Sequence, residues 1–183
     1  MLRLLFAVIY TALTFGANGV AAAPADAGAL LAGDMKKLVI HAEPKPLPEA
    51  TLAGLDDGAA SLSDWHGRWV VANFWATWCA PCREEMPTLD RLAAEMGGEE
   101  FAVVTVATGR NAVPAIRKFF DEAGVTHLPA LRDPKSALAR QIGVMGLPVT
   151  LVLDPEGREV ARLIGDADWG SPEAMAVLRA MMH

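Results

Sequence analysis

The stretch FWATWCAPC, from Phe74 to Cys82, decides the fold of this chain, because an apolar run meets a helical pattern there. The sequence has 183 residues, and its only two cysteines lie in this stretch. Residues 69–75 are almost wholly apolar and rich in β-branched and aromatic types, which predicts a central strand covered on both faces. From Cys82 to Met96 apolar residues recur at helical spacing, which predicts a helix with Pro87 inside it. The cysteine pair is therefore predicted to lie at a strand-to-helix junction.

The spacing of the two cysteines suits thiol–disulfide exchange. Cys79 would begin the helix, where unpaired N–H groups and the positive end of the helix dipole lower the pKa of a thiol. Cys82 would lie one turn further on, close enough to attack a mixed disulfide between Cys79 and a partner. Pro81 fits the first turn, because its missing N–H would have no intrahelical acceptor there. We therefore predict Cys79 as the nucleophile and Cys82 as the resolving thiol.

Two other roles for the pair are open, a structural disulfide and half of a zinc site. A tetrahedral zinc site needs about four ligands, and no second cysteine pair or nearby histidine pair is present to complete one. A structural bridge across this spacing would close a very small ring and remove little entropy from the unfolded chain. The sequence favours exchange chemistry over both roles, and we expect neither a metal nor a cofactor.

The charge argues against one class of partner, and the N-terminus indicates an exported protein. The formal net charge of −6 without basic clusters argues against nucleic acid as a partner. Residues 1–23 contain Arg3, an apolar stretch and a small-residue end, the layout of a secretory signal with cleavage after Ala22. An uncleaved membrane anchor over residues 4–23 is the alternative. We expect a periplasmic location, where a chain with a single CxxC pair has no cysteine for stapling and uses the pair for exchange.

The remaining chain divides into a spacer at 24–39 and one α/β domain at 40–183. The spacer is rich in alanine, glycine and aspartate without a clear period and is predicted to be flexible. An Asp-Gly step between two short apolar runs predicts an N-terminal β-hairpin extension over 50–62. The strand–helix–strand–helix order over 69–124 predicts a parallel core sheet, and a hairpin over 149–164 adds antiparallel strands.

The rest of the domain is predicted to contain a short strand, a final helix and two histidines without a catalytic role. A short strand is predicted within 125–131, and a final helix is predicted to start at Pro172 with Ser171 as its N-cap. The loop residues His66 and His127 are expected to be solvated or structural rather than catalytic.

Two separated stretches resemble the signatures of one family. FWATWCAPCREEMP at 74–87 and GLPVT at 146–150 look like the motifs of the TlpA/ResA-like, exported thioredoxin-fold thiol:disulfide oxidoreductases, and the likeness covers about residues 40–182. The resemblance implies a thioredoxin-like fold, with a central mixed sheet flanked by helices. It also implies a cis peptide bond at Leu147-Pro148, facing the cysteines across a groove; an ordinary trans proline at a strand start is the alternative.

The resemblance also implies how a client binds. In this family the backbone before the cis-proline pairs with the partner's chain as an added strand, which presents the partner's cysteine to the nucleophile. We therefore count Pro148 among the catalytic residues and expect Trp78, Pro81 and Leu147 to contact the client.

One departure from cytosolic thioredoxins concerns proton handling. Those proteins place a buried acid two residues before Trp75, where this chain has Asn73, which cannot accept a proton. Glu85 lies one turn beyond Cys82 and matches an acidic residue that TlpA/ResA-like proteins use near their active site. We hypothesise that Glu85 takes the proton-handling role. The alternative is a solvated helix carboxylate, as expected for Glu84.

The resemblance implies a periplasmic reductase acting on client proteins that carry disulfides or thiols. By family analogy the clients are apocytochrome c or copper-site assembly proteins, and a membrane thiol carrier supplies the electrons. The Ala-Pro dipeptide between the cysteines contains no cation to stabilise a thiolate, which favours a reducing poise. A disulfide oxidase or isomerase of opposite poise is one alternative.

Two further alternatives fit the sequence poorly. Copper-binding assembly proteins of this fold carry a CxxxC pair and a distal histidine, whereas here the spacing is CxxC and the only histidine after His127 is terminal. A peroxidase would need a proline-threonine context before its cysteine, which is missing.

Overall fold

The structure, a computed structural model, describes residues 27–183, so the predicted signal or anchor at 1–23 lies outside the described residues. The strands are β1 (Val39–Lys45), β2 (Leu52–Ala53), β3 (Ala59–Ala60), β4 (Trp69–Trp75), β5 (Phe101–Thr108), β6 (Ala130–Asp133), β7 (Val149–Leu153) and β8 (Glu159–Ile164). The α-helices are α1 (Ala80–Met96), α2 (Val113–Ala123), α3 (Ala137–Gln141) and α4 (Pro172–Met182). Three short 3-10 helices are η1 (Ala27–Leu30), η2 (Gly33–Lys37) and η3 (Leu62–Trp65).

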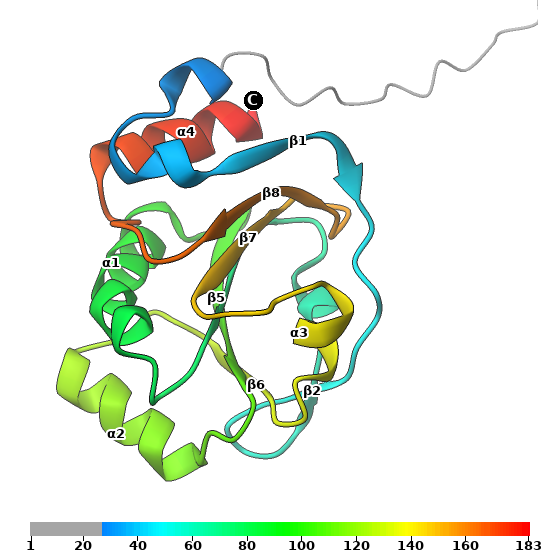
Figure 1. Ribbon diagram of the computed structural model, residues 1–183, viewed down its shortest axis with the longest axis vertical. Coiled ribbons are helices and arrows are strands. Elements are labelled where there is room, and N and C mark those ends of the chain that lie inside the picture. Colours follow the sequence, from blue (N-terminus) through cyan, green and yellow to red (C-terminus); the bar gives the residue numbers. More distant parts are fainter. Residues whose placement is uncertain (1–26) are drawn as a thin grey trace, which may run out of the picture.

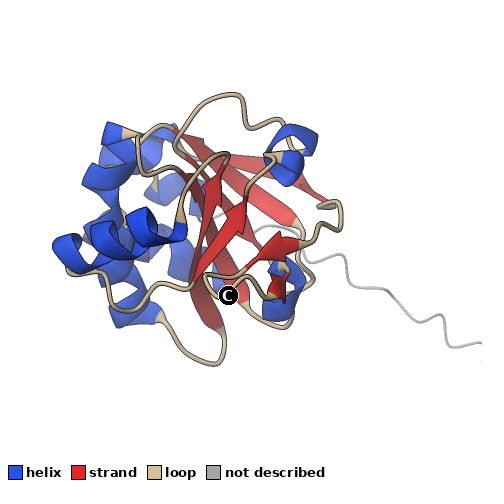
Figure 2. Cartoon of the chain, turned by 90° about the horizontal axis from the view of Figure 1, so that it is seen from below, coloured by secondary structure: helices blue, strands red, loops and turns tan. Residues whose placement is uncertain are grey.

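The strands form one mixed eight-stranded sheet with helices on both faces (Figures 1 and 2). Its order is β1-β8-β7-β4-β5-β6-β2-β3. β4 runs parallel to β5 and antiparallel to β7, and β5 runs parallel to β6. This arrangement confirms the predicted thioredoxin-like α/β fold, including the hairpin extension, in which Leu52 pairs with Ala60 and Ala53 with Ala59.

The central strand β4 explains why its sequence is almost wholly apolar. All its residues from Val70 to Trp75 are buried, because helices cover both faces of the sheet. Successive side chains point to opposite faces, so Phe74 enters one core and Trp75 the other. In the larger core, on the side of α1, α2 and α4, the ring of Trp75 lies 5.4 Å from that of Phe119 and 5.6 Å from that of Phe120.

Local signals in the sequence set the ends of the helices. Gly124 follows α2 with a φ of 68°, a left-handed conformation that glycine adopts without steric cost. The Ser171 hydroxyl accepts a hydrogen bond from the Ala174 N–H at 3.2 Å and caps α4. No helix of residues 27–183 is long and apolar enough to span a bilayer.

The segment 27–38 contradicts the predicted flexible spacer. Figure 1 shows η1 and η2 beside α4, where Ala27, Met35 and Leu38 are buried in the larger core. Lys37 Nζ also donates to the Asp166 carbonyl at 2.7 Å. The prediction failed because isolated apolar residues in 3-10 turns leave no helical or strand period in the sequence.

Two strands also differ from expectation. β1 was not predicted, and it extends the sheet by pairing antiparallel with β8. The strand predicted within 125–131 starts only at Ala130, because residues 125–129 form the connection between α2 and β6. Neither difference moves the junction that holds the cysteines.

Candidate active site

The two cysteines lie at the junction of β4 and α1, as predicted. Cys79 is the N-cap of α1, and its Sγ accepts a hydrogen bond from the Cys82 N–H at 3.3 Å. A disulfide joins Cys79 to Cys82. The start of the helix thus directs a backbone donor at the sulfur of Cys79, which stabilises a thiolate there.

The two sulfurs differ in access. Cys79 keeps 6 % of its surface exposed, whereas Cys82 is fully buried. The neighbouring Trp78 is 69 % exposed and Pro81 is also exposed. Of the two cysteines, only Cys79 therefore has surface that a thiol or disulfide from solvent could contact.

An asparagine that the sequence analysis did not single out holds the turn before Cys79. Asn111 Oδ1 accepts from the Thr77 N–H at 2.8 Å and from the Thr77 hydroxyl at 3.0 Å. Its Nδ2 donates to the Thr108 carbonyl at 2.9 Å. Asn111 is buried and ties the loop after β5 to the turn that presents Trp78. The contact spans 34 residues of sequence, so no local pattern indicates it.

The structure places the predicted cis-proline at the same end of the sheet. The Leu147-Pro148 bond is cis, and β7 starts at the next residue, where Val149 pairs with Phe74. Continued by one residue, this register sets buried Pro148 level with Trp75, shortly before the cysteines. Leu147 is half-buried.

Glu85 is buried one turn beyond Cys82 on α1, with 3 % of its surface exposed. Its Oε1 accepts from Asn73 Nδ2 at 2.8 Å and its Oε2 from the Ala167 N–H at 3.2 Å. Burial raises the pKa of Glu85 to about 7 despite these hydrogen bonds, which lower it, and the negative charge of Asp166 adds to the rise. The alternative of a solvated carboxylate is therefore wrong for Glu85, while Glu84 is exposed as expected.

Asn73 connects Glu85 to the strand after the cis-proline. The side chain is fully buried, and its Nδ2 donates a second hydrogen bond to the Thr150 hydroxyl at 2.9 Å. Asn73 and Thr150 also pair between β4 and β7. No local pattern in the sequence predicts these two bonds of Asn73, because they span 12 and 77 residues.

His66 and His127 are both exposed, and His127 also pairs with a carboxylate of α1. His127 lies 3.0 Å from Asp90 of α1 through Nδ1, and its backbone N–H donates to the same carboxylate at 2.7 Å. Partial burial raises the pKa of Asp90, but hydrogen bonds from His127 and Thr126 outweigh it and lower that pKa overall. His66 packs against Gly157, where an added Cβ would lie 2.4 Å from its Nε2.

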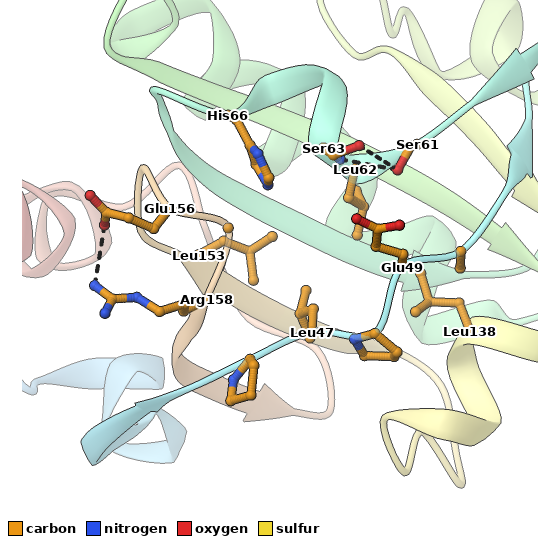
Figure 3. Close-up of a pocket in the computed structure, with 14 residues that line it drawn as sticks. Leu47, Glu49, Ser61, Leu62, Ser63, His66, Leu138, Leu153, Glu156 and Arg158 are labelled. Atoms are coloured by element: carbon orange, nitrogen blue, oxygen red, sulfur yellow. Dashed lines mark hydrogen bonds and ion pairs between the residues drawn. The ribbon is translucent and has the colours of Figure 1, made fainter.

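A separate hollow lies at the opposite end of the sheet (Figure 3). It is lined by Leu47, Leu138 and Leu153 and bordered by Arg158. Leu153 pairs with Val70 at the start of β4, whereas the cysteines follow the end of that strand, so the hollow is remote from them. Arg158 is bonded to two neighbouring carboxylates rather than pointing a free charge into the hollow. In the described part of the chain, no group of three His, Cys, Asp or Glu side chains is placed to hold a metal ion.

Comparison with known proteins agrees with this geometry. The profile of the AhpC/TSA family matches residues 44–161. The thioredoxin-like protein YneN of Bacillus subtilis is 38 % identical over 124 residues, which is 67 % of this chain and 71 % of YneN. The thiol-disulfide oxidoreductase ResA of Bacillus thuringiensis is 28 % identical over 167 residues, 90 % of this chain and 89 % of ResA. The crystal structure of the exposed lipoprotein thioredoxin Etrx1 of Streptococcus pneumoniae superposes with a TM-score of 0.60 and 29 % identity, covering 73 % of this chain and 98 % of Etrx1.

Proposed function

Because this chain belongs to the AhpC/TSA family and is a thioredoxin-like thiol-disulfide oxidoreductase related to ResA, we propose that it reduces disulfides in client proteins. The observation that carries this proposal is the unequal access of a disulfide-bonded pair at the start of α1. Cys79 is largely buried but keeps 6 % of its surface exposed beside the exposed Trp78, whereas Cys82, which is bonded to Cys79, is fully buried. This is the arrangement that a two-step exchange requires.

The reaction proceeds in two displacements. The Cys79 thiolate attacks one sulfur of the client disulfide, forms a mixed disulfide and releases the other client sulfur as a thiolate. Cys82 then loses its proton and attacks Cys79 Sγ, which forms the Cys79–Cys82 disulfide and releases the second client thiolate. Two electrons pass from the cysteine pair to the client. A thiol electron donor, which we propose to be a membrane protein, restores the dithiol.

Glu85 is proposed to receive the proton of Cys82. It lies one turn along α1 from that cysteine, and burial raises its pKa to about 7, so it accepts and returns a proton near neutral pH. Asn73, which stands two residues before Trp75, offers no carboxylate for this step.

The reducing direction rests on the residues around Cys79. Neither Ala80 nor Pro81 carries a cation that would stabilise a cysteine thiolate, and Glu85, one turn beyond Cys82, is acidic. Titration against dithiothreitol mixtures should give a reduction potential near that of thioredoxin, about −270 mV. A value near that of the oxidase DsbA, about −120 mV, would assign the oxidase or isomerase alternative instead.

The place of action is proposed to be outside the cytoplasm. Residues 1–23 have the layout of an export signal or anchor, and Etrx1 is an exposed lipoprotein. By family analogy we propose clients in cytochrome c maturation or copper-site assembly. Capture of mixed disulfides identifies them without prior assumption.

The capture experiment uses the two single-cysteine variants as a matched pair. Cys82→Ser keeps the nucleophile but removes the resolving thiol, so covalent client adducts should accumulate and be released by dithiothreitol. Cys79→Ser keeps only the buried thiol and should form none. Equal adduct formation by the two variants, or none by either, would contradict the proposed reaction.

A further inference from the structure

The amide of Asn73 makes two hydrogen bonds and leaves one atom unpaired in the core. Its Nδ2 donates to Glu85 Oε1 at 2.8 Å and to Thr150 Oγ1 at 2.9 Å. Its Oδ1 is buried and has no hydrogen-bond partner. A buried acceptor without a partner loses its hydration and gains nothing in return, which is rare in folded proteins. The arrangement therefore calls for a chemical reason.

The two partners of this amide are a carboxyl group and a hydroxyl group. A carboxylate only accepts hydrogen bonds, but the neutral carboxylic acid has an O–H that donates. The Thr150 hydroxyl both donates and accepts. If the Asn73 amide turns by 180°, Oδ1 occupies the position of Nδ2 and accepts from the Glu85 O–H and from the Thr150 O–H. The same three side chains thus keep a hydrogen bond to Glu85 in either protonation state, while the end of the amide turned away from Glu85 has no partner in either orientation.

We propose that Asn73 is a positioning residue that turns its amide when Glu85 changes protonation state, donating to the carboxylate and accepting from the acid. The proposal rests on the proposed function in one respect, since the proton that Glu85 takes is the one that leaves Cys82. In that step the S–H bond of Cys82 breaks and an O–H bond forms on Glu85. The turn of the amide moves no proton itself.

The other groups around the Glu85 carboxyl cannot change between donor and acceptor, so Asn73 alone is able to adapt to the protonation state of Glu85. The Ala167 N–H donates to Oε2 at 3.2 Å, and a backbone donor cannot become an acceptor. Asp166, in the same segment after β8, acts on Glu85 through its negative charge and favours the neutral acid. The Thr88 hydroxyl donates to the Glu85 carbonyl, so the backbone of Glu85 is held as well. Of the groups that bond directly to the Glu85 carboxyl, only the amide of Asn73 is able to change from donor to acceptor.

Nuclear magnetic resonance on the oxidised full-length protein tests the turn directly. The Glu85 carboxyl carbon is titrated from pH 4 to 9 while the side-chain N–H₂ signals of Asn73 are followed. With Glu85 ionised, both Asn73 protons are hydrogen-bonded, should be protected from exchange and should show contacts to Glu85 and Thr150. With Glu85 neutral, they lose these partners, and their protection should fall about tenfold, the factor that one hydrogen bond of ordinary strength supplies. The chemical shift of the Glu85 carboxyl carbon and the protection of the Asn73 protons should change with the same midpoint pH.

Two variants make the assignment specific. Glu85→Gln removes the titrating group and should abolish the pH dependence of the Asn73 signals. Thr150→Val removes the second partner but keeps Glu85, so the dependence should remain. Asn73 signals that stay constant while Glu85 titrates would show a fixed donor and overturn the proposal, as would a Glu85 carboxyl that does not titrate in this range. Neither result bears on disulfide exchange, which is measured separately and does not enter this experiment.

Discussion

Replacing Glu85 by glutamine should stabilise the oxidised protein at alkaline pH much more than at acidic pH. Burial raises the pKa of Glu85 in the folded protein to about 7, above the ordinary value of 4.5 that holds in the unfolded chain. Below about pH 4.5 the Glu85 carboxyl is protonated in both the folded and the unfolded state. Its burial then costs no charge, and the free energy of unfolding has its full value. Between these values the unfolded chain releases the proton and the folded protein keeps it. The free energy of unfolding then falls as the pH rises.

The size of this effect follows from the two pKa values. The difference between about 7 and 4.5 corresponds to about 3 kcal/mol, lost at up to about 1.4 kcal/mol per pH unit and complete above about pH 8. Because Glu85 is only 3 % exposed, solvent screens little of this term. Glutamine keeps the shape of the side chain without the charge. The gain of Glu85→Gln over the natural chain should therefore grow with pH by about 3 kcal/mol.

Urea unfolding between pH 4.5 and 8.5 measures this difference, with the fluorescence of buried Trp75 and Trp169 as the probe. The matched control is Glu84→Gln, which removes a carboxylate from the exposed neighbouring position and should keep the pH dependence of the natural chain. A Glu85→Gln variant with an unchanged pH dependence would refute the reasoning, because the buried carboxyl would then not titrate between pH 4.5 and 8.

Three further changes test other parts of the structure. Asn111→Ala leaves the Thr77 N–H without its acceptor, so it should lower the free energy of unfolding by about 1–3 kcal/mol. It should also speed alkylation of Cys79 in the reduced protein. An unchanged alkylation rate would show that Asn111 does not hold the turn before Cys79. Met35→Ala opens a cavity beneath η2 and should cost about 2–5 kcal/mol in urea unfolding, whereas a flexible spacer would show no loss. Asp90→Asn should lower the free energy of unfolding at neutral pH. The loss relative to the natural chain should shrink as the pH drops below the ordinary Asp pKa of 3.8, because the folded state holds the pKa of Asp90 lower. A loss of stability that persists in acid would point to packing instead.

The sequence predicted those parts of the molecule that local patterns determine. The apolar run of β4, the helical spacing of α1 and the glycine after α2 each reflect a physical preference of a few adjacent residues, and the structure has these elements where they were expected. Features that join distant segments had no such signal. The bond between Asn73 and Thr150 spans 77 residues, and Asp90 meets His127 across 37. Burial of Met35 depends on α4, near the other end of the chain.

The register of β4 determines which chemistry the site supports. Val71, Asn73 and Trp75 point to the face covered by α1, whereas Val70, Ala72 and Phe74 point to the other core. Only this alternation brings the amide of Asn73 against Glu85. A slip of one residue would set Phe74 there, and the carboxyl would lose the donor on β4, one of its two hydrogen-bond donors. The pairing of Asn73 with Thr150 also ties this register to β7, which starts directly after Pro148. The register of the central strand therefore places the Glu85 carboxyl, the cysteines and the cis-proline relative to one another. The apolar run that indicated the fold thus also determines which side chain bonds to the Glu85 carboxyl.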